Sequence, residues 1–320
     1  MKRTFRQASG LTGDETRASL LRFNWSAGLR GVFDTIGAGT NFIFVGFARS
    51  LGVAKEQMGW VSFIVSCACL LQMAVIPLIG RIRRKKRFAL SLALTEPFLV
   101  MVAVGLALLL PPGLRLVAFV TAVFMAAASA HMSRPITDDW FASSIPTEIR
   151  GRYLGRRLRI VSIVTIISTY MCGTIGERIG MDNTVGLGLL LIGGACCGVA
   201  AVVVLRDAPM PALAAHSQPR LTDFIVALNT RPFARYLVLI AVFNIPFFFA
   251  VPYYQVFHLE IVKMPASLIA VMQSGYYIVK ILALPFLGRL VDRWGPRKTM
   301  YVAGAIYALF FSTYMFCEPG

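Results

Sequence analysis

The chain has 320 residues, of which 57% are hydrophobic and 15% are charged, and its mean hydropathy is +0.69. Soluble globular domains carry about 25% charged and about 45–50% apolar residues, so this composition excludes both a disordered chain and an ordinary soluble enzyme. The net charge of +17 does not indicate a nucleic-acid partner, because the Lys and Arg residues lie between apolar blocks and form no separate basic domain.

The apolar residues form blocks of about twenty, the length that a helix needs to cross the hydrocarbon core of a bilayer. We therefore expect an all-α polytopic membrane protein, with the lipid bilayer as its partner. The predicted spans are residues 29–47, 58–80, 88–110, 114–133, 158–177, 184–205, 236–257, 266–288 and 299–317. Residues 1–28 are polar and basic and lack the apolar region of a signal peptide, which predicts a cytoplasmic tail.

The distribution of basic residues supports nine spans and a cytoplasmic N-terminus. With this orientation the inside segments hold 25 Lys and Arg residues and the outside segments hold 5, as the positive-inside rule requires. The longest connection, residues 206–235, contains Pro209, Pro211 and Pro219. Its composition predicts a cytoplasmic linker between one helical bundle over residues 29–205 and a second over residues 236–320.

A short internal repeat supports this division into two bundles. Residues 77–82 read Pro-Leu-Ile-Gly-Arg-Ile and residues 285–290 read Pro-Phe-Leu-Gly-Arg-Leu, at equivalent points of the second and eighth predicted spans. Repeated six-helix halves are a known architecture of secondary transporters. The same offset places Arg84 where the second half has Asp292, so a base replaces an acid in the first copy.

Two loops of the chain resemble loops of the major facilitator superfamily. Residues 288–298 read Gly-Arg-Leu-Val-Asp-Arg-Trp-Gly-Pro-Arg-Lys and are similar to the loop between the eighth and ninth helices of that family. Residues 145–155 resemble the region that joins its fourth and fifth helices. The resemblance implies a two-bundle fold with 9 of an expected 12 transmembrane helices. Residues 236–320 would then be the first three helices of an incomplete second bundle, in a truncated reading frame; a natural nine-span protein is the alternative.

The resemblance also implies a conformational gate in these loops. An acid at position 292 can meet the positive N-terminus of the fifth predicted helix, near Arg157, and so latch the two bundles together. The alternative is a basic loop that only sets membrane topology. The gate residues implied by the resemblance are Gly288, Asp292, Arg293, Gly295, Arg297, Arg150 and Gly151.

Ionisable residues inside the predicted spans are candidates for a substrate or ion pathway, because a charge in hydrocarbon is costly unless it faces a wet cavity. Glu96 and Lys280 each lie eight residues from a span end, about 12 Å deep. Glu96 either carries a proton or forms a structural ion pair with a neighbouring helix. Lys280 holds an anionic substrate, pairs with an acid such as Glu96, or snorkels to the interface. Asp34 lies four residues after Arg30, a spacing that favours a local pair.

The seventh predicted span contains two prolines, which break its hydrogen-bond ladder, and broken helices in transporters tend to line the pathway. Polar and aromatic residues of the seventh and eighth spans therefore join the candidate pathway, and Asn41 of the first span is expected on the opposite wall. The full candidate set is Asp34, Asn41, Glu96, Asn244, Gln273, Tyr276, Tyr277 and Lys280.

These features predict a secondary active transporter of a small organic solute that works by alternating access. Proton coupling, sodium coupling and uniport all remain open. The sequence contains no Walker A or HExxH motif and no Cys or His cluster at metal spacing, so we expect no enzyme activity, catalytic residue, metal or cofactor. The alternatives from other classes are a non-transporting sensor or remnant of a transporter fold, and a membrane-embedded enzyme. The resemblance and the lack of a targeting segment indicate the inner (cytoplasmic) membrane of a bacterium.

Overall fold

The computed structural model describes residues 13–37, 41–75, 78–79, 82–146, 149–211, 226 and 229–313, with some side chains inside these ranges left undescribed. All regular elements of the described residues are helical. They are α1 (Gly13–Gly37), α2 (Phe42–Ser50), η1 (Lys55–Gln57), α3 (Met58–Cys67), η2 (Ala68–Leu70), α4 (Leu71–Val75), α5 (Lys85–Leu109), α6 (Pro112–Ser144), α7 (Arg150–Ile179), α8 (Thr184–Arg206), α10 (Arg231–Val256), η4 (Phe257–Ile261) and α11 (Ala266–Thr313). Six segments of the described chain are long and apolar enough to cross a membrane, in agreement with an all-α integral membrane protein.

The third to sixth predicted spans correspond to α5, α6, α7 and α8. Two of these helices are longer than their apolar blocks, because α6 continues to Ser144 and α7 begins at Arg150. Hydroxyl side chains support the extension of α6: Thr137 Oγ1 donates to the Ser133 carbonyl at 3.2 Å and Ser144 Oγ donates to the Trp140 carbonyl at 2.8 Å. The helix therefore runs well beyond the hydrophobic window that predicted it.

The first predicted span is not a single helix. Helix α1 begins at Gly13, ahead of the predicted boundary and with acidic residues in its first turn, and ends at Gly37. Helix α2 begins at Phe42, where the Asn41 side chain accepts a hydrogen bond from the Ile43 amide at 2.9 Å. Asn41 thus serves as the N-cap of α2, a position that satisfies an otherwise unpaired amide at a helix start.

The later spans also differ from the prediction in detail. The region 58–80 is divided into α3, η2 and α4 rather than forming one α-helix, and part of it lies outside the described residues. Helix α10 passes directly into a π-helical turn, η4. The eighth and ninth predicted spans form α11, which is interrupted at Gly295 with φ 79° and ψ 158°. Only glycine adopts this conformation without a steric cost, so Gly295 allows the chain to reverse direction there.

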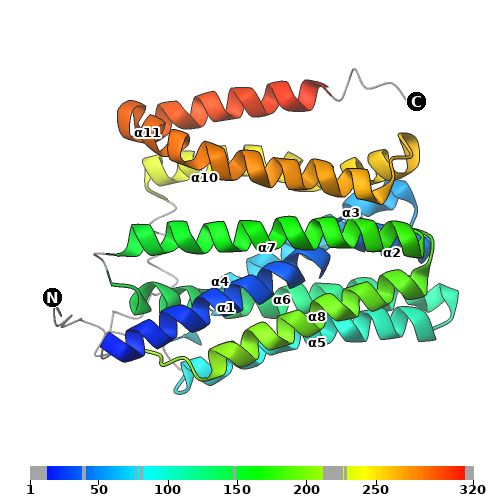
Figure 1. The fold of residues 1–320 in the computed structure, drawn as a ribbon, viewed down its shortest axis with the longest axis horizontal. Helices are drawn as coiled ribbons and strands as arrows, with labels where there is room; N and C mark the ends of the chain where they lie inside the picture. The colour runs from blue at the N-terminus through cyan, green and yellow to red at the C-terminus, as the bar shows by residue number, and fades with distance from the viewer. Residues whose placement is uncertain are drawn as a thin grey trace.

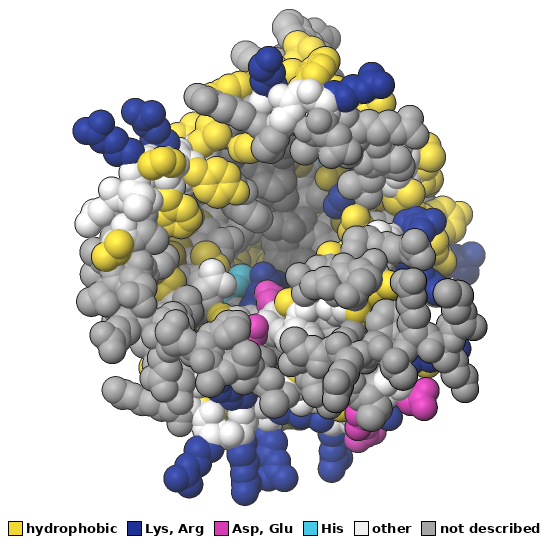
Figure 2. Space-filling view, turned by 90° about the vertical axis from the view of Figure 1, so that its left-hand side faces the viewer, with side chains coloured by type: hydrophobic (Ala, Val, Ile, Leu, Met, Phe, Trp, Pro, Cys, Tyr) yellow, Lys and Arg dark blue, Asp and Glu magenta, His cyan; other side chains and the backbone are white. Residues whose placement is uncertain are grey.

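Figure 1 shows that α1, α5 and α7 begin at the same end of the molecule, where α6 and α8 end and where α11 turns at Gly295. We name this the basic end, because Lys and Arg side chains surround it in Figure 2. The opposite, distal end contains α2 and η4. Helix α11 packs along α7, and α10 packs against α3. These contacts join the two halves of the chain.

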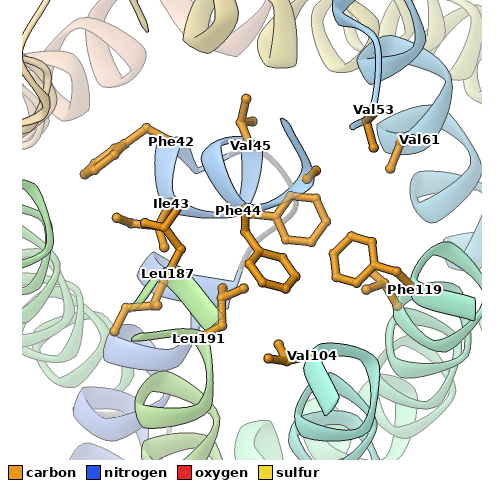
Figure 3. Close-up of a cluster of buried hydrophobic side chains, with 14 of the residues drawn as sticks. Phe42, Ile43, Phe44, Val45, Val53, Val61, Val104, Phe119, Leu187 and Leu191 are labelled. Atoms are coloured by element: carbon orange, nitrogen blue, oxygen red, sulfur yellow. The ribbon is translucent and has the colours of Figure 1, made fainter. Parts of the chain in front are cut away.

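The largest apolar core lies at the distal end and is built around α2 (Figure 3). Every residue from Phe42 to Ala48 in α2 is buried. The Phe44 ring lies 5.5 Å from the ring of Phe119 in α6, and Leu187 and Leu191 of α8 pack in the same cluster. Residues 42–48 carry no charged or polar side chain, so they can be buried on every side without leaving a polar group unpaired. The position of α2 fills the distal end with apolar side chains.

Candidate functional site

A polar cavity of about 280 Å³ lies among α1, α5, α6, α7 and α8. Figure 2 shows a hollow at the basic end, with acidic and basic side chains on one side of it. We name the polar cavity the central cavity. A second lobe of about 320 Å³ extends along α7 and shares Arg30, Asp34 and Arg157 with it. The charged residues that line the central cavity are Arg30, Asp34, Glu96, Arg134, Asp138 and Arg157.

A buried ion pair between α1 and α5 forms part of the cavity wall. Arg30 Nη1 and Nη2 donate to the two carboxylate oxygens of Glu96 at 2.5 and 2.7 Å. Glu96 is only 9% exposed and lies halfway along α5. Such a two-point contact fixes the geometry as well as the charge of the pair.

Asp34 completes a three-residue cluster with this pair. Arg30 Nε donates to Asp34 Oδ1 at 2.8 Å, so the local pair predicted from the spacing of four residues is confirmed. The alternative pairing of Glu96 with Lys280 is wrong, because Arg30 binds both oxygens of Glu96. The side chain of Asp34 is 55% exposed, so it is the most accessible member of the cluster in the cavity.

Two charged residues of the cavity, one in α5 and one in α6, are each followed by a proline inside the helix. Pro97 follows Glu96 in α5, and Pro135 follows Arg134 in α6. A proline within a helix removes the hydrogen bond to the carbonyl four residues earlier. Both helices therefore carry a backbone acceptor without its usual partner near the central cavity, as is common where helices line a transport pathway.

The sequence analysis did not assign a role in the cavity to Asp138 or to Arg157, and it left Arg134 out of the candidate pathway. Arg134, Asp138 and Phe141 are spaced by four and then three residues, so they share one face of α6. The Arg157 guanidinium lies over the Phe141 ring at 4.0 Å. The fourth predicted span ends at residue 133, whereas α6 continues to Ser144, so this amphipathic face lies beyond the apolar block that predicts the helix.

The candidate residues of α11 lie together. Gln273 Nε2 donates to Gln255 Oε1 of α10 at 3.3 Å. Lys280 Nζ lies 5.8 Å from the centre of the Tyr277 ring. The neighbouring Tyr276 is 63% exposed. Among the described residues, no group of three or more His, Cys, Asp or Glu side chains is arranged to hold a metal ion.

A sequence profile of the Major Facilitator Superfamily matches residues 28–320. The chain belongs to the Major Facilitator Superfamily. It is therefore a membrane transporter, because members of this superfamily carry small-molecule substrates across a lipid bilayer. The family resemblance, the all-α fold and the membrane location predicted from the sequence are confirmed. A comparison with curated proteins found no match.

The gate residues implied by the superfamily resemblance are only partly described. The side chains of Gly288, Asp292, Arg297, Arg150 and Gly151 lie outside the described residues, as does that of Asn244 in the candidate pathway. Arg293 is exposed, and Gly295 interrupts α11. The gate and these pathway assignments therefore stay predictions.

Contacts between the two halves of this superfamily member close the distal end. Arg49 at the end of α2 forms a salt bridge with Glu260 of η4. The Tyr253 hydroxyl of α10 donates to the Glu56 carbonyl at 2.9 Å, and its ring covers Gly59 of α3 so closely that an added Cβ would lie 2.5 Å from it. These contacts and the apolar core around α2 lie at the end of the molecule opposite the hollow.

Proposed function

We propose that the protein is a secondary transporter of a small organic solute and works by alternating access. The observation that carries this proposal is the difference between the two ends: the charged central cavity is hollowed toward the basic end, whereas the apolar core and contacts between the halves close the distal end. By the positive-inside rule the basic end faces the cytoplasm. This orientation puts the N-terminus in the cytoplasm, and we assign the protein to a bacterial inner membrane.

We propose that Glu96 couples transport to protons. A carboxylate that accepts two hydrogen bonds from one guanidinium holds that guanidinium firmly. Protonation of Glu96 removes its negative charge and releases Arg30 toward the cavity, where Asp34 still holds it on one side. Substrate binding and proton binding would thereby act on the same side chain, which is the requirement for coupling two equilibria.

The remaining candidate residues have proposed roles around this cluster. Gln273, Tyr277 and Lys280 of α11 provide polar and aromatic groups for the solute. We propose three further pathway residues from the sequence alone: Tyr276, Asn41 and Asn244. Asp292, with the glycines of its loop, is proposed to latch the two bundles at the basic end when the cavity opens distally.

Glu96→Gln is expected to separate proton-driven accumulation from exchange. Glutamine keeps the volume and accepts a hydrogen bond from Arg30 but does not titrate, so uphill accumulation driven by a proton gradient should fall by at least about tenfold. Counterflow, in which labelled solute exchanges for unlabelled solute, needs no net proton movement and should persist. Both fluxes are measured with the full chain in liposomes, using a panel of radiolabelled organic solutes.

Asp139→Asn provides the matched control, because Asp139 is an exposed acid of α6 and its neutralisation should leave both fluxes unchanged. Equal proton-driven accumulation in Glu96→Gln and in the unmodified protein would contradict coupling through Glu96. Absence of counterflow for every solute of the panel in the unmodified protein would instead count against secondary transport itself.

A further inference from the structure

Five consecutive basic residues surround a second cavity at the basic end. Residues 83–87 read Arg-Arg-Lys-Lys-Arg, and with Met210 and Pro211 they line a space of about 590 Å³. We name this space the basic pocket. The described residues of its lining include no acidic side chain, whereas both arginines and carboxylates line the central cavity.

The apolar wall of the basic pocket, Met210 and Pro211, belongs to the segment that follows α8. Contacts to this segment hold the wall in place. Lys86 Nζ donates to the Ala208 carbonyl at 2.7 Å, and Trp140 Nε1 donates to the Pro209 carbonyl at 3.1 Å. Ala208 is fully buried in a cluster with Phe23 and Trp140. These contacts hold residues 208 and 209 in place, with Ala208 beside the basic run, and Met210 and Pro211 follow them directly in the chain.

Of the five basic residues of the pocket, Lys86 has an acidic neighbour, Asp207, whereas the other four have no ion-pair partner among the described residues. Within the described part of the chain, Arg83, Arg84, Lys85 and Arg87 take part in none of the salt bridges. Arg84 is the N-cap residue of α5 and makes no side-chain hydrogen bond to the helix. The amides of the first turn of α5 therefore lack a side-chain cap, and the helix dipole adds positive potential to that of the side chains.

The sequence repeat indicates that this charge is specific to the first half of the chain. The equivalent position in the second half is an acid, Asp292, where the first half has Arg84. An acid at a helix N-terminus satisfies the free amides from within the protein. Arg84 cannot do so, which leaves these amides open to an anion from outside the chain.

We propose that the basic pocket binds the headgroup of an anionic phospholipid. Helix α5 begins at Lys85 and is long and apolar enough to cross the membrane, so its first turn lies at the level of the lipid headgroups. Arginine pairs bidentately with phosphate oxygens, and Met210 and Pro211 offer an apolar contact for the glycerol carbons. Basic pockets beside transmembrane helices recognise lipid headgroups in this way. The proposal does not depend on the transport function.

The proposal is tested on the full chain in nanodiscs of phosphatidylcholine to which phosphatidylglycerol is added, with retained lipid counted by native mass spectrometry after release. The unmodified protein should retain phosphatidylglycerol in preference to phosphatidylcholine. The double variant Arg83→Gln/Arg84→Gln should bind phosphatidylglycerol about 30-fold more weakly, because each basic residue near the surface contributes about a five- to sixfold factor. The matched control, Arg159→Gln/Arg231→Gln, removes two exposed charges elsewhere at the basic end and should bind normally.

Equal retention by the Arg83→Gln/Arg84→Gln variant and the control would overturn the proposal. Release of the lipid by millimolar inorganic phosphate would overturn the assignment to a lipid, because it would identify a site for a free anion. If the double variant does not fold, a measurement on the unmodified protein still tests the proposal. Hydrogen exchange of the first-turn amides of α5 should slow when phosphatidylglycerol replaces part of the phosphatidylcholine, and unchanged exchange would also contradict the proposal.

Discussion

Arg30→Met is expected to lower the free energy of unfolding by about 3–5 kcal/mol and to abolish transport. Glu96 is 9% exposed, and both of its carboxylate oxygens accept hydrogen bonds from Arg30. Removal of the guanidinium leaves a buried carboxylate without a counter-charge, which is more costly than losing an apolar contact. Thermal unfolding of the detergent-purified protein and solute flux in liposomes measure the two effects.

The double variant Arg30→Met/Glu96→Met separates stability from function. Replacing both members of a buried ion pair by apolar side chains is often neutral or stabilising, so this variant should unfold near the temperature of the unmodified protein while transport remains abolished. Arg159→Met serves as the control, because Arg159 is exposed and surface substitutions change stability by less than about 0.5 kcal/mol. Unchanged stability and flux in Arg30→Met would contradict a structural and functional role for the pair.

Features that depend on local sequence were predictable. The apolar blocks located α5 and α8 closely, because a bilayer fixes the length of a spanning helix and basic residues mark its ends. The Arg30–Asp34 pair was predicted because residues four apart meet on a helix surface.

The partner of Glu96 could not be predicted from the sequence, because Arg30 lies 66 residues away on a different helix. Sequence position gives the depth of a residue in the membrane but not the direction in which its side chain points. Lys280 has the same predicted depth as Glu96, yet it lies beside Tyr277 on α11. Only the packing of α1 against its neighbours brings Arg30, rather than Lys280, within reach of the Glu96 carboxylate.

The positions of Asp138 and Arg157 were missed for a different reason. Hydropathy windows end where charged residues begin, but α6 and α7 extend past their apolar blocks toward the basic end. The charged residues of these extensions lie on helices that face the central cavity. A search for helical periodicity beyond the hydrophobic window would have placed Asp138 and Phe141 on one face of α6.

Gly173→Ala in α7 is expected to open the distal end and to reduce transport. A Cβ at position 173 would collide with the Ala270 side chain and would lie 2.8 Å from the Ala266 carbonyl oxygen of α11. Neither group can rotate away, because one is a methyl on the backbone and the other is the backbone itself. The two helices must therefore separate, at a cost of about 1–3 kcal/mol. The adjacent Cys172 is buried in the distal core and reports this separation.

The measurement is the rate at which a membrane-impermeant maleimide labels Cys172 from the distal side, with the other five cysteines replaced by serine. Gly173→Ala should raise this rate by about tenfold if the closed state loses about 1.4 kcal/mol. Gly155→Ala adds the same methyl group to the same helix, at a position where a Cβ meets nothing within 4 Å, and should leave labelling unchanged. Because the two variants differ only in what the methyl group touches, equal labelling rates would show that the close contact between α7 and α11 does not seal the distal end.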